Sequence, residues 1–114
     1  MVQNRNKLVE LFIANLSNAI IHKILEKAIN IKEIASKYNK EIKNSWQIAQ
    51  YYRKKINPIN TPFLIKDIEE VKRKIKNWVL AELKLRIKRG YENIDLTLID
   101  SIIDEDLREM GVVK

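Results

Sequence analysis

The chain has 114 residues, of which 46% are hydrophobic, and a formal net charge of +7, so one folded domain with a packed core is expected and a disordered chain is excluded. It has no cysteine and a single histidine, which excludes a disulfide scaffold, an iron–sulfur cluster, a thiolate zinc site and a multi-histidine metal site. With only two glycines and two prolines, neither a sheet of hairpins nor a phosphate-binding P-loop is expected.

The first predicted element covers residues 4–29, as either two short helices or one kinked helix. Apolar residues recur at helical spacing as far as Leu16, but from Ile20 onward the apolar face moves round the helix. Ser17 and Asn18 are good N-cap residues, which places the break beside them. No apolar run approaches the length of a bilayer span, and the polar first residues lack a signal-peptide pattern, so we expect a cytoplasmic protein without a membrane partner.

The second helical pattern covers residues 31–56, where apolar residues are three and four positions apart. A capping box that starts at Asn44 indicates a break there. As an alternative, residues 21–56 form a helix-turn-helix that reads duplex DNA, although residues 39–41 lack the small residue expected in its turn.

The end of this segment combines aromatic and cationic side chains. In a single helix over residues 45–56, Tyr51 points almost directly away from the core, and an exposed ring among cations suits stacking on a nucleobase. Trp46 and Tyr52 can equally be aromatic residues at the edge of the core, with the cations extending past them. The residues of this candidate binding cluster are Trp46, Tyr51, Tyr52, Arg53, Lys54 and Lys55.

The proline-containing segment at residues 57–62 is the clearest linker, because each proline removes a backbone donor and disfavours helix in the residue before it. We therefore expect one helical-bundle domain over residues 1–114, with subdomains at about 1–56 and 62–114 joined by a hinge at 57–61. Every strong pattern has helical period, so the expected fold class is an all-α bundle of five or six helices in these two halves.

The longest predicted helix has Thr61 as its N-cap and Pro62 in its first turn, and it runs to about Arg89, with Gly90 as its stop. Trp78 lies on its apolar stripe and is expected in the core. On the opposite side, polar residues form a ridge that spans roughly 33 Å and can follow several phosphates of a strand. The ridge contains Lys66, Arg73, Asn77, Lys84 and Lys88.

Further charged residues follow toward the C-terminus. Glu82 and Arg86 are four residues apart and are expected to pair, which either fixes the orientation of the helix or presents Arg86 to a phosphate. A last helix, capped by Asp95 and closed by Gly111, carries most of the remaining acidic residues. Its carboxylates are scattered around the helix axis, so neither a metal site nor a catalytic residue is expected there.

Charge is divided unevenly along the chain. The first ninety residues carry 20 Lys and Arg against 8 Asp and Glu, whereas residues 91–114 carry 2 against 7. Phosphate neutralisation would draw a nucleic acid to the basic part, and the acidic tail would limit where the nucleic acid lies. The alternative is a solvated charged surface on which the acidic last helix lies against a basic neighbour.

The basic all-helical composition, the linker at residues 57–62 and the run from Tyr51 to Lys55 resemble the helix-bundle module that follows the catalytic domain in replication primases of archaeal plasmids. The resemblance covers nearly the whole chain and assigns no individual functional residue. It implies a non-catalytic helper in DNA replication, which holds single-stranded template DNA for a separate catalytic primase domain. It also implies binding of nucleotides such as ATP, whose triphosphate would suit the cations beside Tyr51 and Trp46.

Three classes of function stay open from the sequence. They are a module that binds single-stranded DNA or nucleotides, a helix-turn-helix regulator that binds duplex DNA, and a helical subunit of a protein–protein assembly. Because the chain offers no P-loop and no clustered carboxylate pair, we expect it alone neither to hydrolyse ATP nor to extend a primer.

Overall fold

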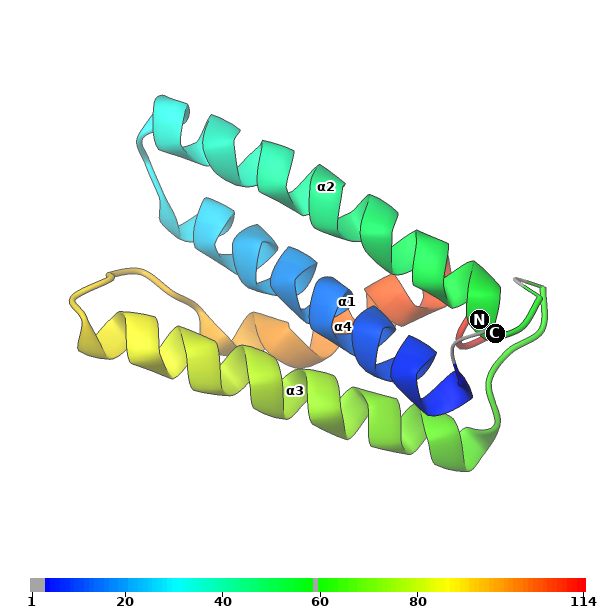
Figure 1. Cartoon of the computed structure of the whole chain (residues 1–114). Helices are drawn as coiled ribbons and strands as arrows, with labels where there is room; N and C mark the ends of the chain where they lie inside the picture. The colour runs from blue at the N-terminus through cyan, green and yellow to red at the C-terminus, as the bar shows by residue number, and fades with distance from the viewer. Residues whose placement is uncertain (1–3, 59) are drawn as a thin grey trace.

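The computed structural model describes residues 4–58 and 60–114, which form four α-helices and one short 3-10 helix and contain no strand (Figure 1). The all-α prediction is confirmed. The expected count of five or six helices is wrong, because the two breaks predicted in the first half do not occur. The elements are α1 (Arg5–Ala28), α2 (Lys32–Ile56), α3 (Ile65–Lys88), η1 (Leu96–Leu98) and α4 (Ile99–Glu109).

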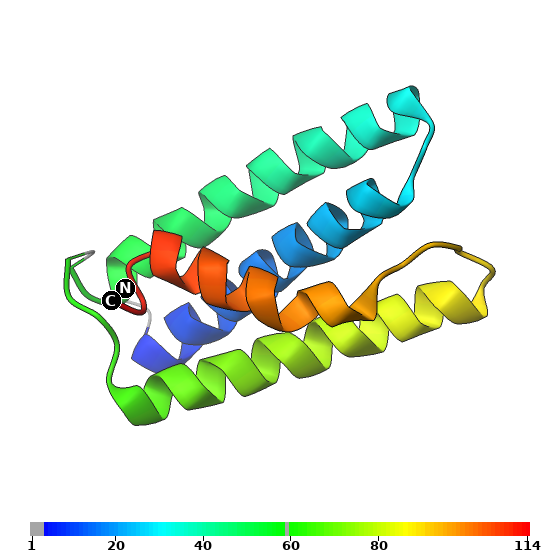
Figure 2. The same ribbon diagram turned by 180° about the vertical axis from the view of Figure 1, so that it is seen from behind.

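Helix α1 lies at the centre of the bundle, between α2 and α3, with α4 behind it in Figure 1 and in front of it in Figure 2. It packs against all three of these helices, so apolar side chains are buried around most of its circumference. The shift of the apolar face after Leu16 therefore follows a change of neighbouring helix and needs no kink. Ser17, expected to cap a second helix, is buried within α1.

The apolar character of α1 is greater than the sequence pattern indicated. By length and composition this helix could cross a membrane, with a mean hydropathy of 1.4 over an 18-residue window. The expectation that no run approaches a bilayer span was therefore wrong. In the bundle, 56% of that window is buried, as in the core helix of a folded domain.

Helix α2 is continuous and lies along α1 as its antiparallel neighbour (Figure 1). The break expected at Asn44 does not form, because core-facing residues continue at helical spacing on both sides of it, from Tyr38 to Ala49. The helix also continues through residues 39–41, where the turn of a helix-turn-helix was expected. The expected helix-turn-helix motif is therefore wrong, since two long helices lie side by side where two short crossing helices were required.

A buried arginine fastens the linker between α2 and α3 to the C-terminal segment. Arg53 is fully buried, and its guanidinium directs all five N–H groups at protein oxygens. Four of these bonds reach backbone carbonyls at 2.8–3.2 Å. The acceptors lie at or beyond the C-terminal ends of α2 and α4, where the helix dipoles favour a cation. They are the carbonyls of Asn57, Thr61, Met110 and Gly111 and the side chain of Asn57.

Helix α3 begins at Ile65, later than the predicted start at Pro62. The residues before it are held in another conformation, because Arg53 donates to the Thr61 carbonyl and the Phe63 N–H donates to the carbonyl of Val112 at 3.0 Å. The end of the helix agrees with the prediction. Lys88 is its last residue, and Gly90 follows with a φ of 101°, which a residue without Cβ adopts readily.

Residues on both sides of the linker build one core. The core combines Phe12 of α1 and Ala49 of α2 with Leu107 of α4, and Phe63, just before α3, also packs into it. Helix α4 follows directly on η1, which Asp95 caps by accepting from the N–H of Thr97 at 3.0 Å. The two expected halves are therefore parts of a single bundle, and the predicted linker is the irregular segment that connects them.

Candidate nucleic-acid interface

The flank of α3 that faces α4 carries neutralised cations. Lys72 pairs with Asp104 at 2.9 Å, and Lys76 pairs with Asp100 at 3.0 Å. These contacts are the ones anticipated by the alternative in which the acidic last helix lies against a basic neighbour. Both lysines are therefore engaged with α4 and contribute little to the attraction of a polyanion.

The predicted ridge lies on the outer side of the same helix, away from its buried stripe. All of its residues are exposed, and none of its four cations forms an ion pair with any residue that the structure describes. A row of unpaired cations along a straight helix is the arrangement that phosphate neutralisation requires. The α3 ridge consists of Lys66, Arg73, Asn77, Lys84 and Lys88.

A second basic surface lies near the end of α2, where Tyr51 is 55% exposed. The Lys55 ammonium lies 5.0 Å from the centre of the Tyr51 ring, and the ring of Tyr52 meets it edge-on at 5.2 Å between centres. Tyr52 is half-buried against the core, and Lys54 is exposed. These four residues form what we call the Tyr51 platform, an exposed ring held in place beside lysines.

Arg53 does not belong to this surface, and its predicted role as a nucleic-acid contact is wrong. The side chain has no exposed area, and every N–H of its guanidinium is bonded to the protein. Burial lowers the pKa of the guanidinium, while the surrounding carbonyls and the ring of Phe63, 4.8 Å away, take the place of lost water. Arg53 is thus a structural residue that holds the linker and the C-terminal segment together.

Trp46 is turned toward α1 and α4 and is not part of the Tyr51 platform. The Lys23 ammonium lies 4.6 Å from the centre of the Trp46 ring and donates to both carboxylate oxygens of Asp106, at 2.8 and 2.9 Å. Burial raises the pKa of the Asp106 carboxyl, against the opposing effect of Lys23. Because Trp46 also packs against the core, its ring is less accessible to a base than the exposed ring of Tyr51.

Glu82 and Arg86 form the predicted pair, in which Arg86 Nε donates to Glu82 Oε1 at 3.1 Å. The guanidinium also lies 5.4 Å from the centre of the Tyr91 ring. Arg86 is half-buried in these contacts. It is therefore held by the protein, in contrast to the exposed cations of the α3 ridge.

His22 lies near this pair on α1. Its Nε2 is 2.9 Å from a carboxylate oxygen of Glu41, and its ring stacks on that of Tyr38 at 5.6 Å between centres. Burial lowers the pKa of the imidazole, which outweighs the opposing effect of the Glu41 carboxylate. The histidine is a partly buried contact between α1 and α2.

Trp78 is the aromatic residue that the sequence pattern misplaced. Expected in the core, it is 46% exposed. The buried residues of α3 keep a strict four-residue spacing from Val71 to Leu83, and Trp78 lies one position off that row. It lines a groove between α1 and α3, together with Asn77 of the α3 ridge. Applying the four-residue spacing strictly would have placed Trp78 at the edge of the stripe.

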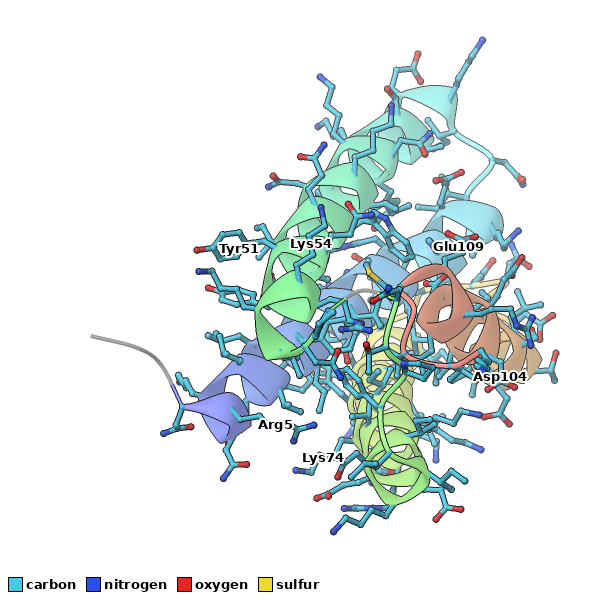
Figure 3. All side chains as sticks on the ribbon, turned by 90° about the vertical axis from the view of Figure 1, so that its right-hand side faces the viewer. Arg5, Tyr51, Lys54, Lys74, Asp104 and Glu109 are labelled. Carbon is cyan, nitrogen blue, oxygen red and sulfur yellow. The ribbon has the colours of Figure 1, made fainter. Side chains whose placement is uncertain are left out.

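Viewed along the bundle, the acidic last helix lies apart from the labelled residues of α1, α2 and α3. Figure 3 shows Tyr51, Arg5 and Lys74 on one side and the acidic residues Asp104 and Glu109 of α4 on the other. Of the 22 Lys and Arg residues, six pair with carboxylates of the described residues and a seventh is the buried Arg53. Most of the others lie on α2 and α3, so the excess positive charge is concentrated on these two helices.

The chemistry that these surfaces offer is charge neutralisation and aromatic stacking. Within residues 4–58 and 60–114, no group of three or more His, Asp or Glu side chains is arranged to hold a metal ion. The acidic residues of α4 face lysines of α1 and α3 at three places. They act there as partners for neighbouring helices.

Comparisons with protein-family models, with curated proteins and with solved structures each found no match to this chain. The resemblance to the primase module therefore stays a prediction. Inference about function rests on the charges, aromatic rings and contacts of the chain itself.

Proposed function

We propose that the chain is a non-catalytic module that binds single-stranded nucleic acid, in particular DNA, through the α3 ridge and the Tyr51 platform. One observation carries this proposal. The cations of α3 that face α4 are paired with carboxylates, whereas those of the outer ridge form no ion pair within the described part of the chain. Positive charge that is aligned along one helix and not neutralised by neighbouring carboxylates is typical of a surface that binds a polyanion.

The preference for a single strand rests on Tyr51. Its side chain is exposed and does not belong to the core, and its ring contacts the ring of Tyr52 and the ammonium of Lys55. In a duplex the faces of the bases are stacked on one another, whereas a single strand can place an unstacked base on an aromatic ring. The Tyr51 platform therefore favours single-stranded over duplex DNA.

Titration of a labelled oligonucleotide of about fifteen nucleotides, as a single strand and as a duplex, at several salt concentrations tests this proposal. The single strand should bind more tightly, and the four ridge cations alone should give a slope of log affinity against log salt near −3, at about −0.7 per phosphate. Binding that ignores salt, or tighter binding of the duplex, would contradict the proposal.

On the same proposal, a nucleoside triphosphate such as ATP is a second ligand of the Tyr51 platform. Its base would stack on Tyr51 while its phosphates meet Lys54 and Lys55. Polymerisation would then belong to a separate catalytic domain, such as a primase. Because ATP and the strand would both stack on Tyr51, calorimetry with ATP, with and without a bound strand, should show that each ligand weakens the binding of the other by the same factor, since linkage is reciprocal.

A specific observation also favours assembly with another protein as a second candidate. Leu64 and Ile65, at the start of α3, are 64% and 77% exposed. Apolar side chains this exposed are common at protein contacts when they form a patch. Sedimentation over a range of protein concentrations distinguishes the two candidates. Self-association that persists at high salt, without salt-sensitive DNA binding, would favour assembly.

A further inference from the structure

The groove between α1 and α3 combines an apolar floor with charged edges. Trp78 is its one aromatic residue among those that the structure describes, and 46% of this residue is exposed. Leu11 and Ala14 of α1 contribute apolar surface beside it. The lining residues are Lys7, Glu10, Leu11, Ile13 and Ala14 of α1 and Lys74, Asn77 and Trp78 of α3.

The charged residues of the groove differ in how strongly the protein holds them. Lys74 pairs with Glu70, one turn earlier on α3, at 3.2 Å. Lys7 and Glu10 form no ion pair with any residue in the described part of the chain. An open carboxylate, an open ammonium and a partly exposed indole therefore line one groove.

We propose that this groove is a pocket for a single nucleobase, which stacks on Trp78. The proposal rests on the proposed binding of single-stranded nucleic acid and adds a site to it. Asn77 belongs to both the groove and the α3 ridge, so a strand whose phosphates follow the ridge passes the mouth of the groove. A base is flat and apolar on its faces and polar along its edge, which matches an indole beside Leu11 and charged groups at the rim.

Glu10 determines which part of a nucleotide enters. Its carboxylate repels a phosphate group but accepts hydrogen bonds from an amino group on a base edge. Cytosine presents such an amino group, whereas thymine presents a carbonyl oxygen at the same position, and a carboxylate is a known acceptor for the cytosine amino group. The pocket should therefore prefer cytosine to thymine, although the two pyrimidines stack on an aromatic ring in similar ways.

Trp78 itself can report occupancy. Trp46 is the only other tryptophan of the sequence, so a Trp46→Phe variant makes the fluorescence of Trp78 the single indole signal. The probes are oligonucleotides of about ten nucleotides, within the usual site sizes of single-strand binders: oligo-dC, oligo-dT and an abasic strand of equal length. We expect quenching by oligo-dC, weaker quenching by oligo-dT, and none by the abasic strand.

Affinity measurements on single variants of the groove, each with a matched control, complete the test. Trp78→Ala should weaken oligo-dC binding roughly 5- to 150-fold, the range for loss of one stacked base. Leu85→Ala is the matched control, because Leu85 is a similarly exposed apolar residue of α3, 40% exposed, that does not line the groove. Glu10→Gln should abolish the preference for oligo-dC over oligo-dT, and Glu69→Gln, an exposed carboxylate of α3 outside the groove, should keep it.

The outcomes separate the base pocket from the proposed function. If the abasic strand binds as tightly as oligo-dC and Trp78 fluorescence does not change, the pocket is wrong while backbone binding stands. If none of the three strands binds even at low salt, the proposed function itself is wrong, and the pocket with it. Equal affinity for oligo-dC and oligo-dT in the unmodified protein would overturn the role of Glu10.

Discussion

The two sides of α3 carry the same kind of residue in different states. Lys72 and Lys76 face α4 and are bonded to its carboxylates, whereas Arg73 and Lys84 face outward and form no ion pair among the described residues. The helix is basic on both sides, so composition alone does not distinguish them. The partner of a cation determines whether it holds the bundle together or remains free for a ligand.

Arg53 and Lys23 are also cations that the protein holds, and their contacts lie in the interior. Both bond to oxygens of other elements, Arg53 to carbonyls near helix ends and Lys23 to the buried carboxylate of Asp106. Substitutions at such positions should change stability, whereas substitutions on the α3 ridge or the Tyr51 platform should change binding.

Arg53→Met should destabilise the protein by about 3–5 kcal/mol, because the carbonyls that accept from the guanidinium would be left buried without a donor. Chemical denaturation followed by circular dichroism measures the loss. Arg53→Lys is the control, and it should recover only part of the stability, since an ammonium has three donors and lacks the planar fork. A fully stable Arg53→Met protein would show that the five hydrogen bonds do not hold the linker.

Asp106→Asn should cost about 1.5–3 kcal/mol of stability, because it removes a charged acceptor that Lys23 bonds through both oxygens. Asp104→Asn is its matched control on the same helix. Its pair with Lys72 is exposed on both sides, so its loss should cost at most about 1 kcal/mol. Affinity for single-stranded DNA should fall in neither variant. A large loss of affinity in Asp106→Asn, at unchanged stability, would contradict the structural role of this pair.

Tyr51→Ala should weaken binding of single-stranded DNA by roughly 1–3 kcal/mol and leave the melting temperature nearly unchanged, because the ring is exposed and stacks on a base. Fluorescence anisotropy and thermal unfolding provide the two readings. Ile48→Ala, which removes another exposed apolar side chain of α2, should change neither. Equal binding by Tyr51→Ala and the unmodified protein would exclude the Tyr51 platform from the interface.

His22 should give a small dependence of stability on pH. Its pKa in the folded protein is below its ordinary value of 6.5, so below pH 6.5 the unfolded chain binds the proton more readily than the folded one. Stability should therefore fall as the pH is lowered from 6.5 toward the folded pKa, and should not change through this group above 6.5. His22→Gln should remove that component, which thermal unfolding of both proteins at pH 7.5 and pH 5.5 measures. An identical pH dependence in the two proteins would contradict the shift.

Local patterns in the sequence were sufficient to predict the all-α class, the position of the linker and the exposure of the ridge residues. The period of the apolar residues defines helices, and the same period places the residues of the α3 ridge on the side away from the core. The apolar spacing on both sides of Asn44 already favoured a continuous helix, but the break expected at Ser17 was wrong for a reason outside the local pattern. Helix α1 has neighbours on several sides, so its apolar face can rotate without a break.

The role of Arg53 could not be read from its neighbours in the chain. Its acceptors at Met110 and Gly111 are more than fifty positions away, and they are backbone carbonyls, which leave no mark in a sequence. Within the run from Tyr51 to Lys55 it has the same appearance as the two exposed lysines beside it. Trp78 is the opposite case, since the spacing of Ile75 and Val79 already separates it from the buried row.

We propose that the strand is attracted by the ridge cations, which form no ion pair with the described residues, and not by the overall charge. The most direct test compares two triple variants, Arg73→Gln, Lys84→Gln, Lys88→Gln and Lys27→Gln, Arg108→Gln, Lys114→Gln, which remove equal numbers of exposed cations that form no ion pair with the described residues. For single-stranded DNA, the slope of log affinity against log salt should become shallower by about 2 in the ridge variant, at about 0.7 per lost phosphate contact. The second variant should keep a slope close to that of the unmodified protein. Equal slopes in the two variants would contradict the account.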